Sequence, residues 1–237
     1  MKATRKLVPA FAMLLIAAVM MSTATFAWFS TNASVTATGM TVTAESSNTF
    51  LVISNDSSAI AGADYSAITA AATASADTKL YPTYFDPADN KWYTATGTSI
   101  SDGAALGGVK TPLDSTANYV LEKTFYIRVA DNFANASNLW LEAVTDNSAA
   151  DYQGIVSVVA KVGEVYNSYD SVTGTYTRKA FLATEVNSTD VIAVTVYVYI
   201  NGEHAKVTTE NVNNLTDLGV TLTFSVGNED SELTPST

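Results

Sequence analysis

An alternation of apolar and polar residues with a period of two runs through the chain from residue 119 onward. It is clearest over residues 191–200, where five aliphatic side chains share one face: Ile192, Val194, Val196, Val198 and Ile200. Tyr197 and Tyr199 project from the opposite face. This period is typical of a β-strand with one face in the core. The next dipeptide, Asn201-Gly202, predicts a two-residue hairpin turn, since both residues tolerate the positive φ such a turn needs.

Other segments repeat the alternation. The predicted inward-facing sets are Phe125, Ile127 and Val129; Leu139, Leu141 and Ala143; Val156, Val158, Ala160 and Val162; and Val220, Leu222, Phe224 and Val226. Residues 178–186 predict one more strand. Near the start, Met40, Val42 and Ala44 lie on the opposite parity to Val35 and Ala37, which predicts a bend at Gly39.

Residues 54–113 are rich in Ala, Ser, Thr, Asp and Gly, and they predict a loop-rich insertion. A short strand is expected at 50–53, just before it. Within the insertion we expect a short helix in the alanine-rich stretch 59–80. Strands are expected at 80–85 and 91–94, on either side of a turn at 86–90.

Many short strands and no long amphipathic helix predict an all-β fold. We expect an antiparallel two-sheet β-sandwich, jelly-roll-like, over residues 39–237. A parallel α/β fold is excluded, because the helical crossovers it needs are missing.

The N-terminus has the order of an export signal. Three cations, Lys2, Arg5 and Lys6, precede the apolar run 7–21, and small side chains at Thr25 and Ala27 suit a signal peptidase. We expect residues 1–27 to be a signal peptide cleaved after Ala27. The alternative is an uncleaved membrane anchor over residues 7–29.

Charge and cysteine content narrow the class of protein. The chain has 12 Lys and Arg against 23 Asp and Glu, and cleavage after Ala27 would leave nine cations and a formal charge of −14. Such a charge disfavours nucleic acid and anionic lipid as partners. We expect contact with the membrane only through the signal peptide. No cysteine is present, so there is no disulfide framework and no thiolate site.

Candidate catalytic and metal-binding residues are few. His204 is the single histidine, and neither a zinc-hydrolase spacing nor a serine-nucleophile motif occurs, so we expect no catalytic or metal site and an exposed His204. Oxygen ligands for weak calcium sites cluster at Asp86, Asp89 and Asn90 and at Asp146, Asn147 and Asp151, although such residues are also ordinary turn residues. Tyr197, Tyr199 and Trp140 either form a solvent-facing surface for carbohydrate or a partner, or pack against the second sheet.

Both ends of the chain resemble a known family. The runs 24–32 and 35–42 are similar to exported Gram-positive proteins whose signals are cut by a SipW-type peptidase, and 194–202 with 219–225 resemble the ending of the TasA/camelysin family of biofilm matrix fibre proteins. The resemblance implies a secreted jelly-roll domain that polymerises with itself, with the freed N-terminal segment of one subunit completing the sheet of its neighbour.

Residues 28–38 form the candidate donor segment. They carry no charge and no proline, and they offer Trp28, Phe29, Val35 and Ala37 for burial. The alternatives are a first strand within the same subunit or a disordered end. Export would itself act as the switch, because the segment is joined to the signal before cleavage. We expect a non-enzymatic extracellular fibre subunit; the alternatives are a monomeric surface or adhesive module, a secreted metalloprotease and a membrane-anchored pilin.

Overall fold

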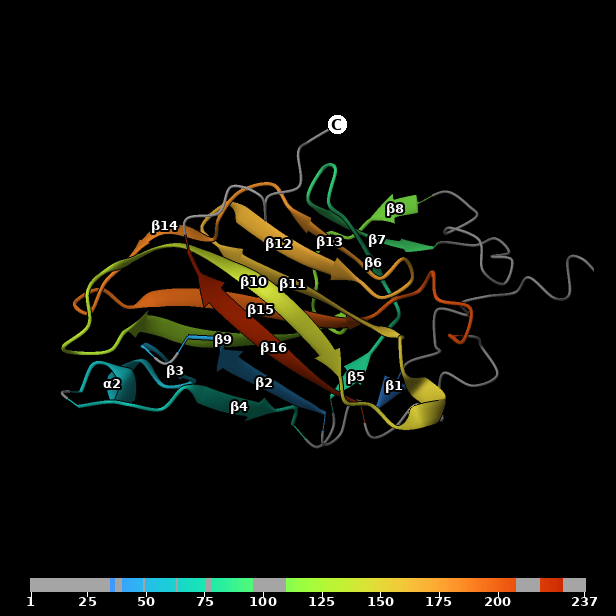
Figure 1. Ribbon diagram of the computed structural model, residues 1–237. Coiled ribbons are helices and arrows are strands. Elements are labelled where there is room, and N and C mark those ends of the chain that lie inside the picture. Colours follow the sequence, from blue (N-terminus) through green and yellow to red (C-terminus); the bar gives the residue numbers. More distant parts are fainter. Residues whose placement is uncertain are drawn as a thin grey trace, which may run out of the picture.

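The protein is a sandwich of two large β-sheets (Figure 1). The computed structural model describes residues 35–36, 40–48, 50–62, 64–75, 78–95, 110–207 and 218–227. The two large sheets confirm the predicted all-β sandwich.

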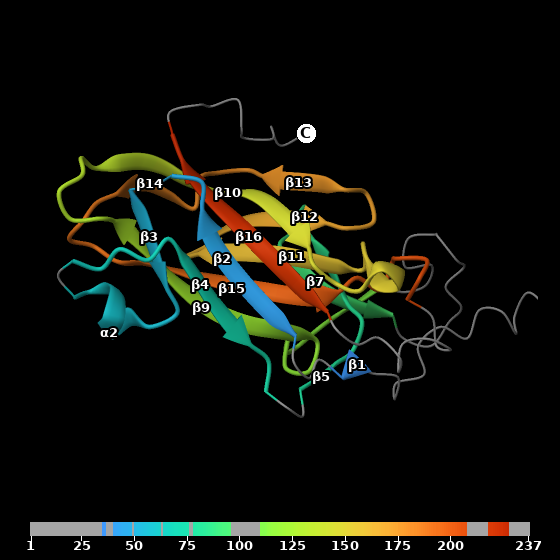
Figure 2. The same cartoon turned by 60° about the horizontal axis from the view of Figure 1, so that its bottom comes forward.

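The first sheet has five strands in the order β14-β10-β16-β2-β4 (Figure 2). Their bounds are β2 (Thr41–Ser46), β4 (Thr69–Thr73), β10 (Ala136–Asp146), β14 (Ala183–Val186) and β16 (Gly219–Val226). β2 and β16 run parallel, with Thr41 opposite Gly219 and Ser46 opposite Phe224, while the other ladders of this sheet are antiparallel.

The second sheet has six antiparallel strands in the order β13-β12-β11-β15-β9-β3. Their bounds are β3 (Leu51–Ser54), β9 (Val120–Val129), β11 (Val156–Val162), β12 (Val165–Asp170), β13 (Thr175–Arg178) and β15 (Ile192–Ile200).

Short elements complete the fold. A three-stranded sheet packs on the six-stranded sheet, and a two-stranded pair lies at one end of the sandwich. The elements are β1 (Val35–Thr36), β5 (Lys79–Leu80), β6 (Tyr84–Asp86), β7 (Lys91–Ala95), β8 (Lys110–Pro112), the helix α2 (Ser57–Ile60) and the 3-10 helix η1 (Ala150–Tyr152). Asp56 caps α2, since its Oδ1 accepts from the Ser58 and Ala59 amides.

The core lies between the two large sheets and contains most of the predicted inward-facing residues. Phe125, Ile127 and Val129 are fully buried, as are Val194, Val196 and Val198 on the neighbouring strand β15. From the facing sheet come Val42, Ala44, Leu222 and Phe224.

A β-bulge in β10 breaks one predicted alternation. The register shifts between Leu141 and Ala143, and Val144 rather than Ala143 packs against the core. Side chains of the other sheet satisfy the backbone there. Asn167 Oδ1 accepts from the Leu141 amide at 3.1 Å, and Arg178 Nε donates to the Leu141 carbonyl at 2.8 Å.

The predicted hairpin at Asn201-Gly202 is wrong. β15 pairs with β9 and β11 on its two sides, so no returning strand has room beside it. Asn201 is fully buried, and its Nδ2 donates to Ser157 Oγ at 3.0 Å and to Asp170 Oδ1 at 2.8 Å. Its side chain therefore links the start of β11 to the end of β12.

Two further predictions need correction. Residues 178–186 form not one strand but the end of β13 and then β14, which belong to different sheets. In the stretch 59–80, helix α2 reaches only Ile60, and the alanine-rich run forms strand β4 along β2. Small side chains fit an edge strand there, because tertiary pairing outweighs the helix preference of alanine. The predicted strand at 91–94 is confirmed as β7, whereas the predicted strand at 80–85 is divided between the end of β5 and the start of β6.

Candidate functional site

The N-terminal segment enters the sandwich at one end. Val35 and Thr36 pair antiparallel with Leu80 and Lys79 of the same chain, outside both large sheets. The other predicted residues, Thr25, Ala27, Trp28, Phe29 and Ala37, lie outside the described residues. For Val35 and Thr36, this pairing corresponds to the alternative of a first strand within the same subunit.

The opposite end of the sandwich carries an apolar groove of about 340 Å³. Its lining residues are all uncharged: Phe50, Phe133, Ala134, Asn135, Ala136, Ser137, Val226 and Gly227. The rings of Phe50 and Phe133 lie 6.1 Å apart, and 52% of Phe133 is exposed. A concave and mostly apolar surface of this kind is the usual form of a binding site.

The β9–β10 loop holds Phe133 over the groove. Ala130 N donates to the Phe50 carbonyl at 2.7 Å, which ties the loop to the entrance of β3. Asn132 then adopts φ of 74°, a left-handed conformation that Asn tolerates well, and the chain turns so that the Phe133 amide donates to the Ala130 carbonyl. The aromatic ring is therefore presented by an ordered turn.

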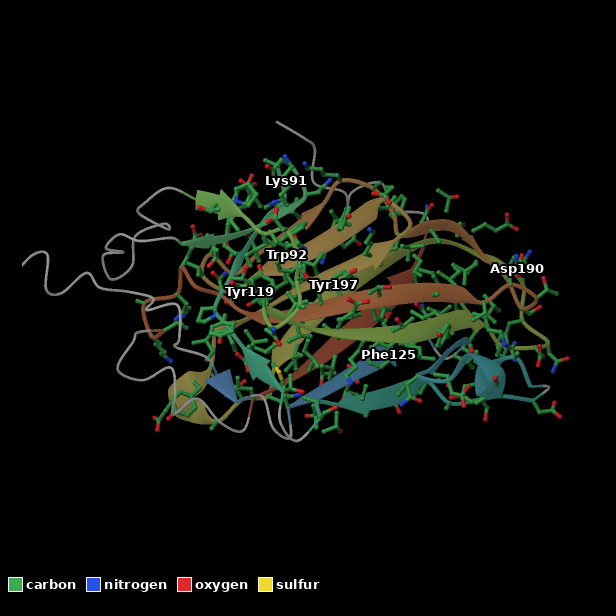
Figure 3. All side chains as sticks on the ribbon, turned by 180° about the vertical axis from the view of Figure 1, so that it is seen from behind. Lys91, Trp92, Tyr119, Phe125, Asp190 and Tyr197 are labelled. Atoms are coloured by element: carbon green, nitrogen blue, oxygen red, sulfur yellow. The ribbon has the colours of Figure 1, made fainter. Side chains whose placement is uncertain are left out.

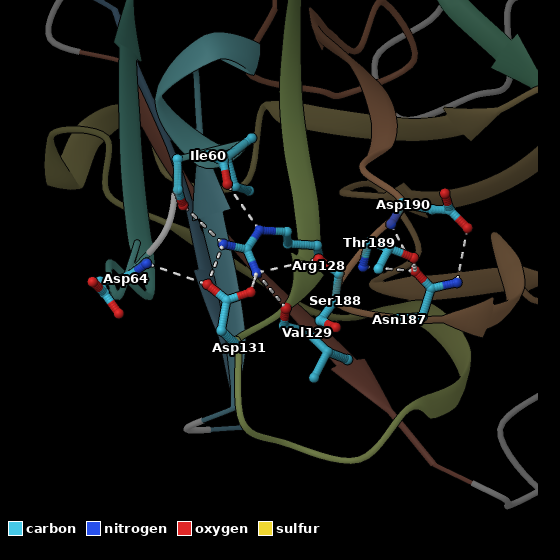
Figure 4. A network of polar contacts seen from close by, with 10 residues as sticks. Ile60, Asp64, Arg128, Val129, Asp131, Asn187, Ser188, Thr189 and Asp190 are labelled. Carbon is cyan, nitrogen blue, oxygen red and sulfur yellow. Dashed lines mark hydrogen bonds and ion pairs between the residues drawn. The ribbon is translucent and has the colours of Figure 1, made fainter.

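Arg128 holds the base of this loop in place (Figure 4). The side chain of Arg128 is only 3% exposed, although it lies on the outward parity of β9. Its Nε donates to the Ile60 carbonyl at 2.8 Å, its Nη1 to the Val129 carbonyl at 2.9 Å and its Nη2 to the Gly62 carbonyl at 3.2 Å. One guanidinium group thus holds the α2 segment against the end of β9.

The same guanidinium group pairs with Asp131 in the loop. Nη1 lies 2.9 Å from Asp131 Oδ1 and Nη2 lies 3.3 Å from Oδ2, a two-point contact that fixes the carboxylate. The bond from Arg128 lowers the pKa of Asp131, and the Asp64 amide adds to the effect. The charge of Asp131 is therefore compensated within the subunit.

The groove and β1 lie at opposite ends of the sandwich, as the parallel pairing of β2 and β16 shows. Both strands start near β1, at Thr41 and Gly219, and both run toward the groove, which Val226 and Gly227 line. Figures 1 and 2 show the same arrangement from two directions, with β1 at one end and β3 with α2 at the other.

An aromatic cluster on the outer face of the six-stranded sheet takes up the predicted tyrosines (Figure 3). The Trp92 ring from β7 lies edge-on to Tyr199 at 5.0 Å and to Tyr197 at 5.8 Å, and Phe85 packs against Trp92 at 5.0 Å. Tyr199 is 2% exposed, and burial followed by the charge of Asp170 raises its pKa.

The prediction of a solvent-facing aromatic surface is wrong, and so is packing against the second sheet. The hairpin of β6 and β7 covers Tyr199, and Tyr197 is half-buried beside it. Trp140 lies on the outer side of the five-stranded sheet under Phe181 and Gly227, 7% exposed. Within the described residues, its buried Nε1 has no hydrogen-bond partner.

The acidic clusters hold turns together. Asp86 Oδ1 accepts from the Ala88 amide at 2.8 Å, and Asp146 accepts from the amides of Ser148 and Gly154 at 2.8 and 2.7 Å. Calcium binding at these clusters stays a prediction.

His204 is half-buried rather than exposed, and its Nδ1 accepts from the Lys206 amide. Burial, aided by the charge of Lys206, lowers its pKa. Over the described part of the chain, no three His, Asp or Glu side chains converge as a metal site would require. No helix in those ranges is long and apolar enough to cross a membrane.

The comparisons with known proteins give no relative: no protein-family model, no curated protein and no solved structure matches the chain. The candidate site therefore depends on geometry. Sequence reasoning missed Phe133 and Arg128. The signal for Phe133 was a single large aromatic residue in the otherwise polar turn 131–138, whereas Arg128 looked like an ordinary outward residue of an alternating strand.

Proposed function

We propose that this protein is a secreted, non-enzymatic structural subunit that assembles with itself into extracellular fibres, using its N-terminal segment to bind a neighbouring subunit. The observation that carries the proposal is the position of β1. This two-residue strand lies at one end of the sandwich and outside both large sheets. In a fibre, a neighbouring subunit would lie at such an end, and residues 28–34 are joined directly to this strand.

The composition of that segment supports the same role. Residues 28–34 have no charge and begin with two aromatic side chains, Trp28 and Phe29, in a chain whose formal charge is −11. Long-range repulsion between such acidic subunits opposes association, so a specific contact has to come from uncharged, apolar groups. An extended segment also gains main-chain hydrogen bonds where it adds to a sheet edge.

The test compares two purified chains, one that begins at Trp28 and one that begins at Val35 and so keeps β1. We expect the longer chain to form fibres in electron microscopy and the shorter chain to elute as a monomer in size-exclusion chromatography at every concentration. Fibres formed equally by both chains would show that residues 28–34 are not the assembly segment. N-terminal sequencing of secreted material, with Trp28 first, checks the cleavage site.

A further inference from the structure

We infer that the groove between Phe50 and Phe133 is the acceptor site for the aromatic residues Trp28 and Phe29 of a second copy, so that subunits join end to end. The inference rests on the proposed function, because it names the surface that receives the assembly segment. It is carried by three observations on the described residues: the nature of the groove, its place in the fold and the reach of the chain.

The groove has the chemistry of an aromatic-binding site. All eight lining residues are uncharged, two are phenylalanines, and Phe133 leaves about half of its surface in water. Aromatic rings pair favourably at centroid separations of about 4.5–7 Å, and the two phenylalanines already lie 6.1 Å apart at the mouth of the groove. An indole or phenyl ring added beside them would bury apolar surface that is now wet.

The groove is also preformed. Arg128 bonds to the α2 segment and to Asp131, and Ala130 bonds to Phe50, so both walls are fixed before any partner arrives. A preformed site avoids the entropy cost of ordering a loop on binding. Arg128 also pairs with Asp131, so this carboxylate of the loop is neutralised within the subunit.

Chain reach assigns the occupant to another copy. Seven residue steps separate Gly219, which pairs with Thr41, from Val226 in the groove, a distance of about 23 Å along β16. Phe29 and Trp28 precede Val35 by six and seven steps, which span at most about 20–22 Å and 23–25 Å when fully extended. Because β1 lies beyond the start of β2 as seen from the groove, the segment of the same chain would have to run straight along the whole sheet to bring either ring near it, whereas a neighbour placed end to end needs no such path.

The contact joins different surfaces of the two copies, the entry end of one and the groove end of the next. A head-to-tail contact of this kind repeats without closing unless the rotation happens to form a ring, and it therefore builds a filament. Because the two contact surfaces lie at opposite ends of the sandwich, the filament would grow along a single axis.

The first test changes Phe133→Ser in the chain that begins at Trp28. Because Phe133 is half exposed, the fold tolerates the change, and we expect the critical concentration for assembly to rise about 10-fold or more. The matched control is Ala71→Ser. Ala71 is exposed in the middle of β4, away from both ends of the sandwich, and this variant should assemble within about twofold of wild type. Circular dichroism confirms that both variants are folded.

The second test uses the absence of cysteine from the chain. Two preparations, Ser30→Cys and Ala134→Cys, are mixed and oxidised, so that every bond between the two variants joins different copies; Ser30 is next to Phe29, and this variant keeps both aromatic rings. We expect a disulfide-linked heterodimer, and much less of it when Val172→Cys replaces Ala134→Cys, because Val172 is exposed in the β12–β13 turn at the end away from the groove. Equal yields would overturn the groove assignment.

The outcomes separate the two proposals. If wild type assembles and Phe133→Ser assembles at the same concentration, the groove inference is wrong while the proposed function stands. If the wild-type chain from Trp28 remains monomeric at all concentrations, both are wrong.

Discussion

Replacing Arg128 with methionine should destabilise the whole sandwich. Methionine keeps most of the length of the arginine side chain but removes every donor that holds the carbonyls of Ile60, Val129 and Gly62. Ile60 is itself fully buried, so its carbonyl has little access to replacement water. The loss therefore leaves buried acceptors without partners, which costs more than the bonds themselves contribute.

The size of the effect follows from those contacts. Hydrogen bonds from a charged group contribute about 1.5–3 kcal/mol each, and neighbouring bonds are not additive. With bonds of 2.8 and 2.9 Å to buried or partly buried carbonyls and a longer one of 3.2 Å, we expect a loss of about 3 kcal/mol in the free energy of unfolding. That is a large share of the stability of an ordinary domain.

Urea unfolding followed by tryptophan fluorescence measures this loss, with Asp131→Asn as the matched variant. Asp131→Asn removes the charge partner but keeps the arginine and its carbonyl bonds. Since 40% of the Asp131 side chain is exposed, we expect a much smaller change from it. A loss under about 1 kcal/mol in Arg128→Met, or an equal loss in both variants, would refute the reasoning that the carbonyl bonds dominate.

Three further predictions concern the aromatic cluster and His204. Trp92→Ala should lower the free energy of unfolding by about 2–3 kcal/mol and expose Tyr199 to water. Thermal unfolding measures the first effect, and acrylamide quenching of tyrosine fluorescence measures the second. Unchanged stability would contradict the role of the β6–β7 hairpin as a cover for Tyr199. Because burial raises the pKa of Tyr199, the stability it contributes is complete below the ordinary tyrosine pKa of 10.0 and is lost as pH rises above it, so ultraviolet titration should show this tyrosine ionising only with unfolding. Because the pKa of His204 is lowered from 6.5, the free energy of unfolding should fall as pH drops from 6.5 through the pKa of the folded state. His204 is the single histidine, so its titration can be followed by nuclear magnetic resonance, and we expect a midpoint below that of the unfolded chain. A midpoint at or above that of the unfolded chain would contradict the burial argument.

The strands with strict alternation were predictable from sequence because burial on one face leaves a period of two. Val194, Val196 and Val198 are buried as their spacing predicts, and so are Leu222 and Phe224. The fold class follows from such segments.

Long-range partners were not predictable in the same way. Asn201 resembles a turn residue because Asn-Gly usually makes one, yet the two neighbours of β15 leave it buried against Ser157 and Asp170. Alternation also placed Tyr199 outside the core correctly, but it gave no information on the hairpin that covers it. A sequence pattern reports which face a side chain takes, and only the fold shows what lies on that face.

Half of the candidate site could be anticipated. The uncharged segment with Trp28 and Phe29 is visible in the sequence, whereas the groove is assembled from the start of β3, the β9–β10 loop and the end of β16. Those three pieces are far apart along the chain, so no local motif marks them.

The pairing of β2 with β16 has a consequence for the time at which the protein folds. β16 lies between β10 and β2, so residues 219–226 supply the middle strand of the five-stranded sheet, and Thr223 bonds to Glu45 across 178 positions of sequence. Until those residues are available, β2 and β10 have no common neighbour and the core stays open on one side. Closing so long a loop is slow. A chain exported across a membrane from its N-terminus would thus stay incompletely folded during export. It would complete this sheet only after residues 219–226 had crossed.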